Sequence, residues 1–399
     1  MAVTVFYRTM LFLLLAVLAG VLTGYFQPLG LIHVAQVLAE LFIKFLKLIS
    51  LPIVFLAVIS TLTSMQNLQE TSSLGRRFLK YTFLTTGIAA VVAMILFYWI
   101  DPVDPQLSVI SNDFAQERQS ISVLLLNFFP DNIITAFAEH NVLGVVLIAL
   151  LIGLAAFYLP KEQQKMVHGL FHSLLNVFMQ LAKVIVLILP VVVWAFTVIL
   201  FQEIQQNSHV LRELVWYSVC ILLANLIQGL VVLPIFLKFH NVSSPELVKR
   251  VFPALVTAFF TRSSAATLPV TIDCLTREKH VSPKVAQFGI PLCSVINMNG
   301  CAAFIFITVH FVMLSNGFTL HWYDSLLWVV VATLAAFGNA AVPMGCFFLA
   351  SALLAGLNVP LHMMGVILTL YVLFDMVETA LNVWSDCSIT QVVDRQLSS

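Results

Sequence analysis

The sequence predicts an all-α polytopic membrane protein. Of its 399 residues 60% are hydrophobic and only 10% are charged, whereas a soluble domain carries about 25% charged residues. The hydrophobic residues gather in runs of the roughly 20 residues that a helix needs to cross a bilayer. Two later runs are interrupted by small residues and proline, which is typical of the broken helices of transporters.

The composition also indicates which classes of binding partner to expect. Net charge is zero and no basic patch suggests a nucleic-acid partner, so membrane lipid and a small-molecule substrate are expected instead. The cysteines occur singly in apolar segments with no CxxC spacing, which predicts small buried residues rather than disulfides or a metal site. They are Cys220, Cys274, Cys293, Cys301, Cys346 and Cys387.

Six apolar runs before residue 240 predict the first spans. The first lacks a small-residue cleavage site, so we interpret it as a retained span rather than a signal peptide. The second contains Pro52. The fourth follows a polar segment that we expect to be a solvated loop (103–120), and it is expected to break at residues 130–132. The runs cover residues 9–25, 34–63, 81–100, 121–158, 167–201 and 213–237.

Basic residues mark the loops on one side of these spans. Because Lys and Arg are enriched in cytoplasmic loops, the pattern predicts a cytoplasmic N-terminus and a location in the cell membrane, the inner membrane in a bacterium. The residues are Arg8, Arg76, Arg77, Lys80, Lys161, Lys165, Lys238, Lys249 and Arg250.

Two segments after residue 250 have the same interrupted design. One (252–275) contains Thr-Arg-Ser-Ser-Ala-Ala-Thr-Leu-Pro in its middle, and the other (327–357) contains Gly-Asn-Ala-Ala-Val-Pro-Met-Gly. Paired breaks of this kind point to a transporter binding site. The alternative is a pair of kinked ordinary helices. We prefer the broken segments because an unusually polar span follows each one (289–313 and 364–390).

Those polar spans carry the candidate site. Asp375, Glu378, Asn382 and Asp386 are spaced i, i+3, i+7 and i+11, so they share one face of a helix. Intramembrane acids are costly and indicate an ion or substrate pathway; the alternative is a peripheral C-terminal helix. The Asn-Met-Asn-Gly sequence at 297–300 is expected to unwind the helix and to offer oxygens there for a cation such as Na⁺. The alternative is that these Asn side chains form interhelical hydrogen bonds.

Four motifs in this order resemble the dicarboxylate/amino acid:cation symporter family, the glutamate-transporter homologues. The resemblance covers nearly the whole chain and implies eight transmembrane helices, two re-entrant helical hairpins, a homotrimer and an elevator mechanism. It divides the chain into scaffold helices 1–2 (1–63), transport-domain helix 3 with an external loop (64–120), scaffold helices 4–5 (121–205) and the transport core (206–399). The motifs are residues 261–271, 297–301, 338–345 and 375–386.

The resemblance also implies roles for individual residues. Asp375 corresponds to the acid that meets the substrate amino group, Arg262 could steady it, and the backbone at 263–264 with Asn382 would receive the α-carboxylate. The positions that resemble substrate contacts are Arg262, Ser263, Ser264, Asp375, Glu378, Thr379 and Asn382. Those that resemble Na⁺ ligands are Thr85, Thr86, Cys293 through its backbone oxygen, Asn297, Asn299, Asn382 and Asp386.

The chain departs from the family at three places. Glu378 stands where members that carry acidic amino acids have an arginine, whose planar donor fork matches a carboxylate. Asn299 replaces a sodium-binding aspartate and Thr82 replaces a nearby aromatic, which predicts that one Na⁺ site is weak or absent. Met344 and Cys346 replace glycines of the second hairpin and could alter the gate.

These departures leave the pocket more negative by one charge than in the acidic-substrate relatives. A cationic or polar neutral amino acid, a proton on Glu378 and an internal salt bridge are the explanations, in that order. We therefore predict a secondary active symporter, coupled to Na⁺ with H⁺ as a further candidate, and not an enzyme. An acidic-substrate symporter with an altered clamp and a non-transporting sensor stay open as alternatives.

Two other classes fit less well. In an aspartyl membrane protease Asp375 and Asp386 would have to share a proton, yet eleven helical residues separate them by roughly 16 Å. A channel would leave the paired interruptions without a purpose.

Overall fold

The computed structural model describes residues 2–64, 72–103, 130–156, 158–206, 209–277, 280–339 and 344–398. Within these ranges the chain is helical and contains no strand, and six helices are long and apolar enough to cross a membrane. The prediction of an all-α polytopic membrane protein is confirmed. Shorter apolar helices at 11–26 and 144–156 bring the described spans to the expected eight, and those at 322–337 and 345–356 form one of the two expected hairpins. The other hairpin is formed by residues 244–261 and 264–276.

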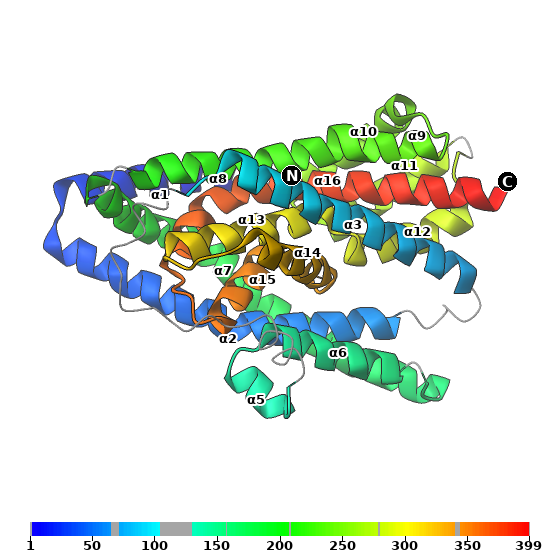
Figure 1. The fold of residues 1–399 in the computed structure, drawn as a ribbon, viewed down its shortest axis with the longest axis horizontal. Coiled ribbons are helices and arrows are strands. Elements are labelled where there is room, and N and C mark those ends of the chain that lie inside the picture. Colours follow the sequence, from blue (N-terminus) through cyan, green and yellow to red (C-terminus); the bar gives the residue numbers. More distant parts are fainter. Residues whose placement is uncertain are drawn as a thin grey trace.

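The N-terminal half supplies a layer of long helices along one side of the molecule (Figure 1). Helix α2 contacts α7 and α6, and α1 contacts α7. Helix α7 begins at Lys161, earlier than the predicted residue 167, because its first turns are polar and extend the apolar run. These helices are α1 (Ala2–Phe26), α2 (Leu29–Ser64), α5 (Ile133–Ala138), α6 (Val142–Ala156) and α7 (Lys161–Gln206).

Residues 130–132 of the fourth segment are non-helical, as the predicted break requires, and the segment has a second break that was not predicted. Asn132 caps α5, its side-chain oxygen accepting from the Ile134 amide at 2.8 Å, and a turn at Glu139–Asn141 then separates α5 from α6. His140 in this turn has a positive φ of 54°. The predicted loop at 103–120 lies outside the described residues apart from Val103, as does the first part of the fourth run.

The sixth span is one helical column with a π-turn inside it. It consists of α8 (His209–Ile227), the π-helix η2 (Gln228–Val232) and α9 (Leu233–Phe239). The Gly229 carbonyl oxygen accepts a hydrogen bond from the Trp384 indole at 3.0 Å. This hydrogen bond comes from a side chain of another helix, and it accounts for the π-helical turn in the span.

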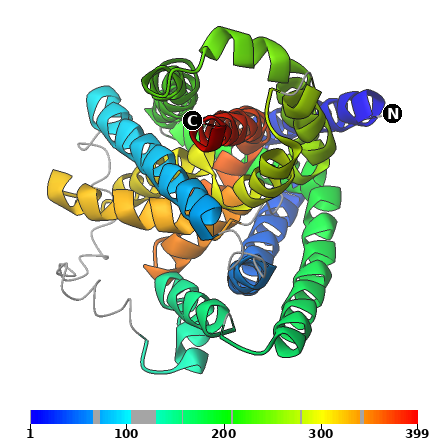
Figure 2. The ribbon, with the colours of Figure 1, turned by 90° about the vertical axis from the view of Figure 1, so that its right-hand side faces the viewer.

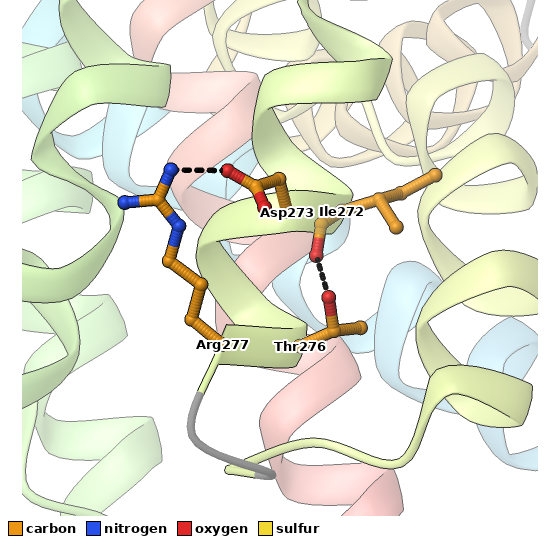
Figure 3. Close-up of polar contacts among 4 residues, drawn as sticks. All are labelled: Ile272, Asp273, Thr276 and Arg277. Carbon is orange, nitrogen blue, oxygen red and sulfur yellow. Dashed lines mark hydrogen bonds and ion pairs between the residues drawn. The ribbon is translucent and has the colours of Figure 1, made fainter.

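The first interrupted segment forms a helical hairpin of α10 (Ser244–Thr261) and α11 (Ser264–Thr276), which contact each other. Arg262 ends α10 in the left-handed conformation (φ 52°), and the Ser263 hydroxyl then caps α11 by accepting from the Ala266 amide. Figure 3 shows the other end of α11, where exposed Asp273 and Arg277 form an ion pair.

The second interrupted segment gives α14 (Trp322–Phe337) and α15 (Gly345–Gly356), which also contact each other. Met344 precedes α15 in the left-handed conformation, with φ 59°. Residues 340–343 of the predicted tip lie outside the described part of the chain.

The two polar spans differ in continuity: the first is interrupted and the second is one unbroken helix. The first unwinds at Asn297 and Met298, between α12 (Pro283–Ile296) and α13 (Asn299–Ser315), as the Asn-Met-Asn-Gly motif predicted. The second is the continuous helix α16 (His362–Ser398). Figures 1 and 2 show α16 enclosed by other helices, and α10, α11, α12, α13 and α3 (Ser72–Ile100) all contact it. The alternative of a peripheral C-terminal helix is therefore wrong.

Gly289 of α12 permits close packing against α3. A Cβ there would lie 2.1 Å from Cζ of the fully buried Phe78. We expect Gly289→Ala to destabilise the protein by about 1–3 kcal/mol, because the Phe78 ring has no free space to enter. The measurement is the thermal unfolding midpoint of the purified protein in detergent. Gly87→Ala is the control: no atom lies within 4 Å of its new Cβ, so its midpoint should stay or rise. Equal midpoints for both variants would contradict the packing argument.

Candidate functional site

A pocket forms where the hairpin α10–α11, the unwound residues before α13, the start of α15 and the middle of α16 meet. All seven residues predicted as substrate contacts line it. The space that the lining residues enclose is about 30 Å³, room for one or two water molecules. The residues that line the pocket are Arg262, Ser263, Ser264, Met298, Cys301, Asn339, Gly345, Cys346, Tyr371, Asp375, Glu378, Thr379 and Asn382.

Opposite charges face each other across this pocket. The Arg262 guanidinium lies 4.0 Å from the Asp375 carboxylate, and both side chains are mostly buried. The left-handed backbone of Arg262 places it at the turn between α10 and α11, where it can reach α16. The arrangement offers an anionic group to a substrate amine beside a cationic group.

Two further substrate positions on α16, Thr379 and Asn382, are held by hydrogen bonds within the protein. The Thr379 hydroxyl donates to the Asp375 carbonyl at 2.6 Å, and the Asn382 side-chain oxygen accepts from the Gly300 amide at 2.9 Å. The polar stripe predicted from the spacing therefore exists, and the unwound start of α13 fixes one of its members.

Glu378 is the most unusual member of the stripe. It is 1% exposed, and neither carboxylate oxygen has a hydrogen-bond partner or an ion pair among the described residues. Burying an unpaired charge is costly, so this carboxyl needs a counter-charge from an occupant of the pocket or a proton. The pocket does contain one internal salt bridge, Arg262–Asp375, but no described residue forms one with Glu378, so its charge is not neutralised in this way.

A second polar cluster lies between α3, residues 297–299 and α16. The Asn297 side-chain amide donates to Asp386 at 2.8 Å, and the Thr85 hydroxyl donates to the Asn297 side-chain oxygen at 3.2 Å. The Asn297 backbone amide donates to the Cys293 carbonyl at 2.8 Å. These predicted Na⁺ positions are thus brought together, and all of them are buried.

Asn299 occupies the other half of this cluster. Its side-chain oxygen accepts from the Thr86 hydroxyl at 2.9 Å and lies 3.3 Å from the Thr85 hydroxyl, whose single hydrogen it shares with the Asn297 oxygen. The Asn299 amide donates to the Ser385 hydroxyl at 2.8 Å. Oxygens of hydroxyl, amide and carboxylate groups are ligands that hard cations take, so the donor set fits Na⁺. The sequence reasoning missed Ser385, although it directly precedes Asp386.

The structure corrects the prediction for two cysteines. Cys301, at the start of α13, and Cys346, at the start of α15, form a disulfide. The other four cysteines are free and buried, as predicted. The pair was missed because its members are 45 residues apart and only the packing of α15 against α13 brings them together.

Other pocket residues were also missed by sequence reasoning. Tyr371 lies one helical turn before Asp375, so extending the polar stripe towards the N-terminus of α16 would have found it. Met298 and Asn339 carry no such signal, because their sites depend on where two separate helices start and end.

Comparison with known proteins agrees with these features. The sodium:dicarboxylate symporter family matches residues 10–396. The chain is 26% identical to an excitatory amino acid transporter of Caenorhabditis elegans, over 87% of this chain and 78% of that protein. It is 27% identical to the neutral amino acid transporter B(0) of Bos taurus, over 87% and 70% of the two chains. An uncharacterized symporter of Haemophilus influenzae is 26% identical, over 91% and 86%.

Proposed function

The chain belongs to the sodium:dicarboxylate symporter family, and from this premise we propose that it carries a cationic or polar neutral amino acid together with Na⁺. One observation supports this choice of substrate above the others: Glu378 is buried in the pocket, and no residue in the described part of the chain forms a hydrogen bond with its carboxylate. A substrate that brings a positive side chain would give this carboxylate the charge it lacks, whereas an acidic side chain would be repelled.

The charges of the pocket can be summed. Arg262 contributes one positive charge, and Asp375 and Glu378 contribute two negative ones, which leaves one negative charge when both acids are ionised. A zwitterion with a cationic side chain neutralises this excess. A neutral amino acid does so only when a proton accompanies it on Glu378, so H⁺ coupling belongs to the second form of the proposal.

Transport follows the elevator mechanism in this proposal, with a homotrimer in the cell membrane and the N-terminus in the cytoplasm. Helices α1, α2, α6 and α7 would form the scaffold, because they contact one another and contribute no residue to the pocket. The hairpins, α12–α13, α16, α3 and α8–α9 would carry the substrate. Because the enclosed space is only about 30 Å³, the pocket would have to widen before an amino acid enters.

A screen of the twenty amino acids and ornithine tests the substrate. We expect lysine, arginine or ornithine to raise the thermal unfolding midpoint of the purified protein in the presence of Na⁺. Glu378→Gln should weaken that binding by about tenfold or more, because a desolvated charged hydrogen bond is lost. Glu40→Gln makes the same change at an exposed residue of α2 paired with Lys44, and it should bind as the wild type does.

The screen also separates the alternatives. A neutral amino acid that binds more tightly at low pH, with the pH dependence lost in Glu378→Gln, would assign that residue as the proton carrier. Stabilisation by aspartate, glutamate or a dicarboxylate would refute the charge argument and support the acidic-substrate alternative. Binding without uptake into proteoliposomes under an inward Na⁺ gradient would support the sensor alternative.

A further inference from the structure

We propose that, when Cys301 and Cys346 are reduced, the pocket binds a thiophilic divalent cation, Zn²⁺, through these two thiolates and the Glu378 carboxylate. This site does not depend on which amino acid is transported. Its three ligands come from three helices, α13, α15 and α16.

The ligand atoms are already close together. The two sulfurs and one Glu378 carboxylate oxygen all lie within 4.8 Å of one another. Ligands at 2.0–2.3 Å from a tetrahedral Zn²⁺ are about 3.3–3.8 Å apart, so changes of side-chain rotamer would complete the geometry. The two cysteine Cα atoms are 5.2 Å apart, and all three residues are at most 3% exposed.

The unpartnered carboxylate is an independent observation that points to a ligand. Glu378 has no hydrogen bond or ion pair among the described residues, so a divalent cation would supply what the protein does not. Zn²⁺ binds Cys sulfur and carboxylate oxygen, and a site with three protein ligands keeps a fourth position for water or another small ligand. An alkali cation prefers oxygen ligands, so the sulfurs separate this site from the Na⁺ cluster.

Amide groups surround the sulfurs in the way that supports thiolates. The Asn339 side-chain amide donates to the Cys301 sulfur at 3.0 Å and to the Cys346 sulfur at 3.6 Å. The Asn382 amide donates to the Cys301 sulfur at 3.7 Å. Hydrogen bonds to the ligands of a metal orient them and tune their basicity. The hydrogen bonds that would orient the two sulfur ligands are therefore already present.

The disulfide makes the site conditional on reduction. Breaking the sulfur–sulfur bond consumes two electrons and two protons and gives two thiols; binding Zn²⁺ then releases the two thiol protons. A phosphine with one water molecule supplies the reduction and becomes the phosphine oxide. Because Cys346 and Glu378 also line the substrate pocket, bound Zn²⁺ and an amino acid would exclude each other.

The test measures metal binding directly on the full-length protein. The protein is reduced with a phosphine, desalted without oxygen and titrated with Zn²⁺ against a chromophoric chelator. We expect one tight ion per protomer in the reduced protein and none in the oxidised protein. With Co²⁺ in place of Zn²⁺, a thiolate-to-cobalt charge-transfer band should appear, which needs no variant.

Variants identify the ligands. Cys301→Ser and Cys346→Ser should each weaken Zn²⁺ binding at least tenfold, and Glu378→Gln about tenfold. Cys274→Ser changes a buried free cysteine away from the pocket and should bind as the wild type does. His168→Ala should too, which separates the site from the stacked His168–His172 pair. Absence of binding in the reduced protein, or binding that survives in the double cysteine variant, would overturn the proposal whatever the transported substrate is.

Discussion

Asp375→Asn is expected to reduce amino-acid binding by about 100-fold or more and to leave the overall fold intact. The Asp375 carboxylate pairs with Arg262 at 4.0 Å in a mostly buried pocket. The variant removes the carboxylate that we propose meets the substrate amino group. Loss of a hydrogen bond between charged groups costs about 1.5–3 kcal/mol, and the upper value corresponds to about 100-fold in affinity. Calorimetric titration with the amino acid found in the screen, at saturating Na⁺, measures the loss.

Asp273→Asn is the matched control for this prediction. Asp273 forms an ion pair with Arg277 at the exposed end of α11 (Figure 3), on the same hairpin but outside the pocket. Exposed ion pairs contribute about 0–1 kcal/mol, so amino-acid affinity should be unchanged. If the Asp375→Asn protein has the wild-type unfolding midpoint and binds the amino acid with wild-type affinity, this carboxylate does not contact the substrate amine.

The sequence predicted the parts of this site that depend on local pattern. The stripe from Asp375 to Asp386 follows from helical spacing alone, and the break at Asn297 follows from polar residues and glycine in an apolar run. The turn at Arg262 was predicted from small residues with a nearby proline. Each of these features is encoded within about a dozen consecutive residues, where periodicity and backbone preference decide the outcome.

The parts that the sequence did not predict depend on long-range packing. The Cys301–Cys346 contact requires α15 to pack on α13. The π-turn at 228–232 reflects a hydrogen bond from Trp384, which is 155 residues away. That Glu378 has no hydrogen-bond partner among the residues the structure describes depends on all of its neighbours together, and the charge sum alone left a salt bridge open. Tertiary context decides such features, and no local propensity reports it.

Asn299→Asp is expected to increase the affinity for Na⁺ by about tenfold or more. The position can accept a carboxylate, because the Thr86 hydroxyl already donates to the Asn299 oxygen, the Thr85 hydroxyl lies 3.3 Å from it, and the Ser385 hydroxyl can rotate to donate as well. A full negative charge near the cation is worth up to about 4 kcal/mol at an effective dielectric constant of 20, and desolvation offsets part of that gain. The Na⁺ dependence of amino-acid binding measures the effect.

Asn297→Asp makes the same substitution two residues earlier and should lower the affinity for Na⁺ rather than increase it. The Asn297 amide donates to Asp386 at 2.8 Å, so a carboxylate in its place would lose that hydrogen bond and repel the aspartate. We expect a lower unfolding midpoint without Na⁺. If both variants raised Na⁺ affinity equally, the gain would come from added charge in general rather than from the hydroxyl cradle around Asn299. A difference between them would show that the hydroxyls of Thr85, Thr86 and Ser385 around position 299 set the strength of one Na⁺ site.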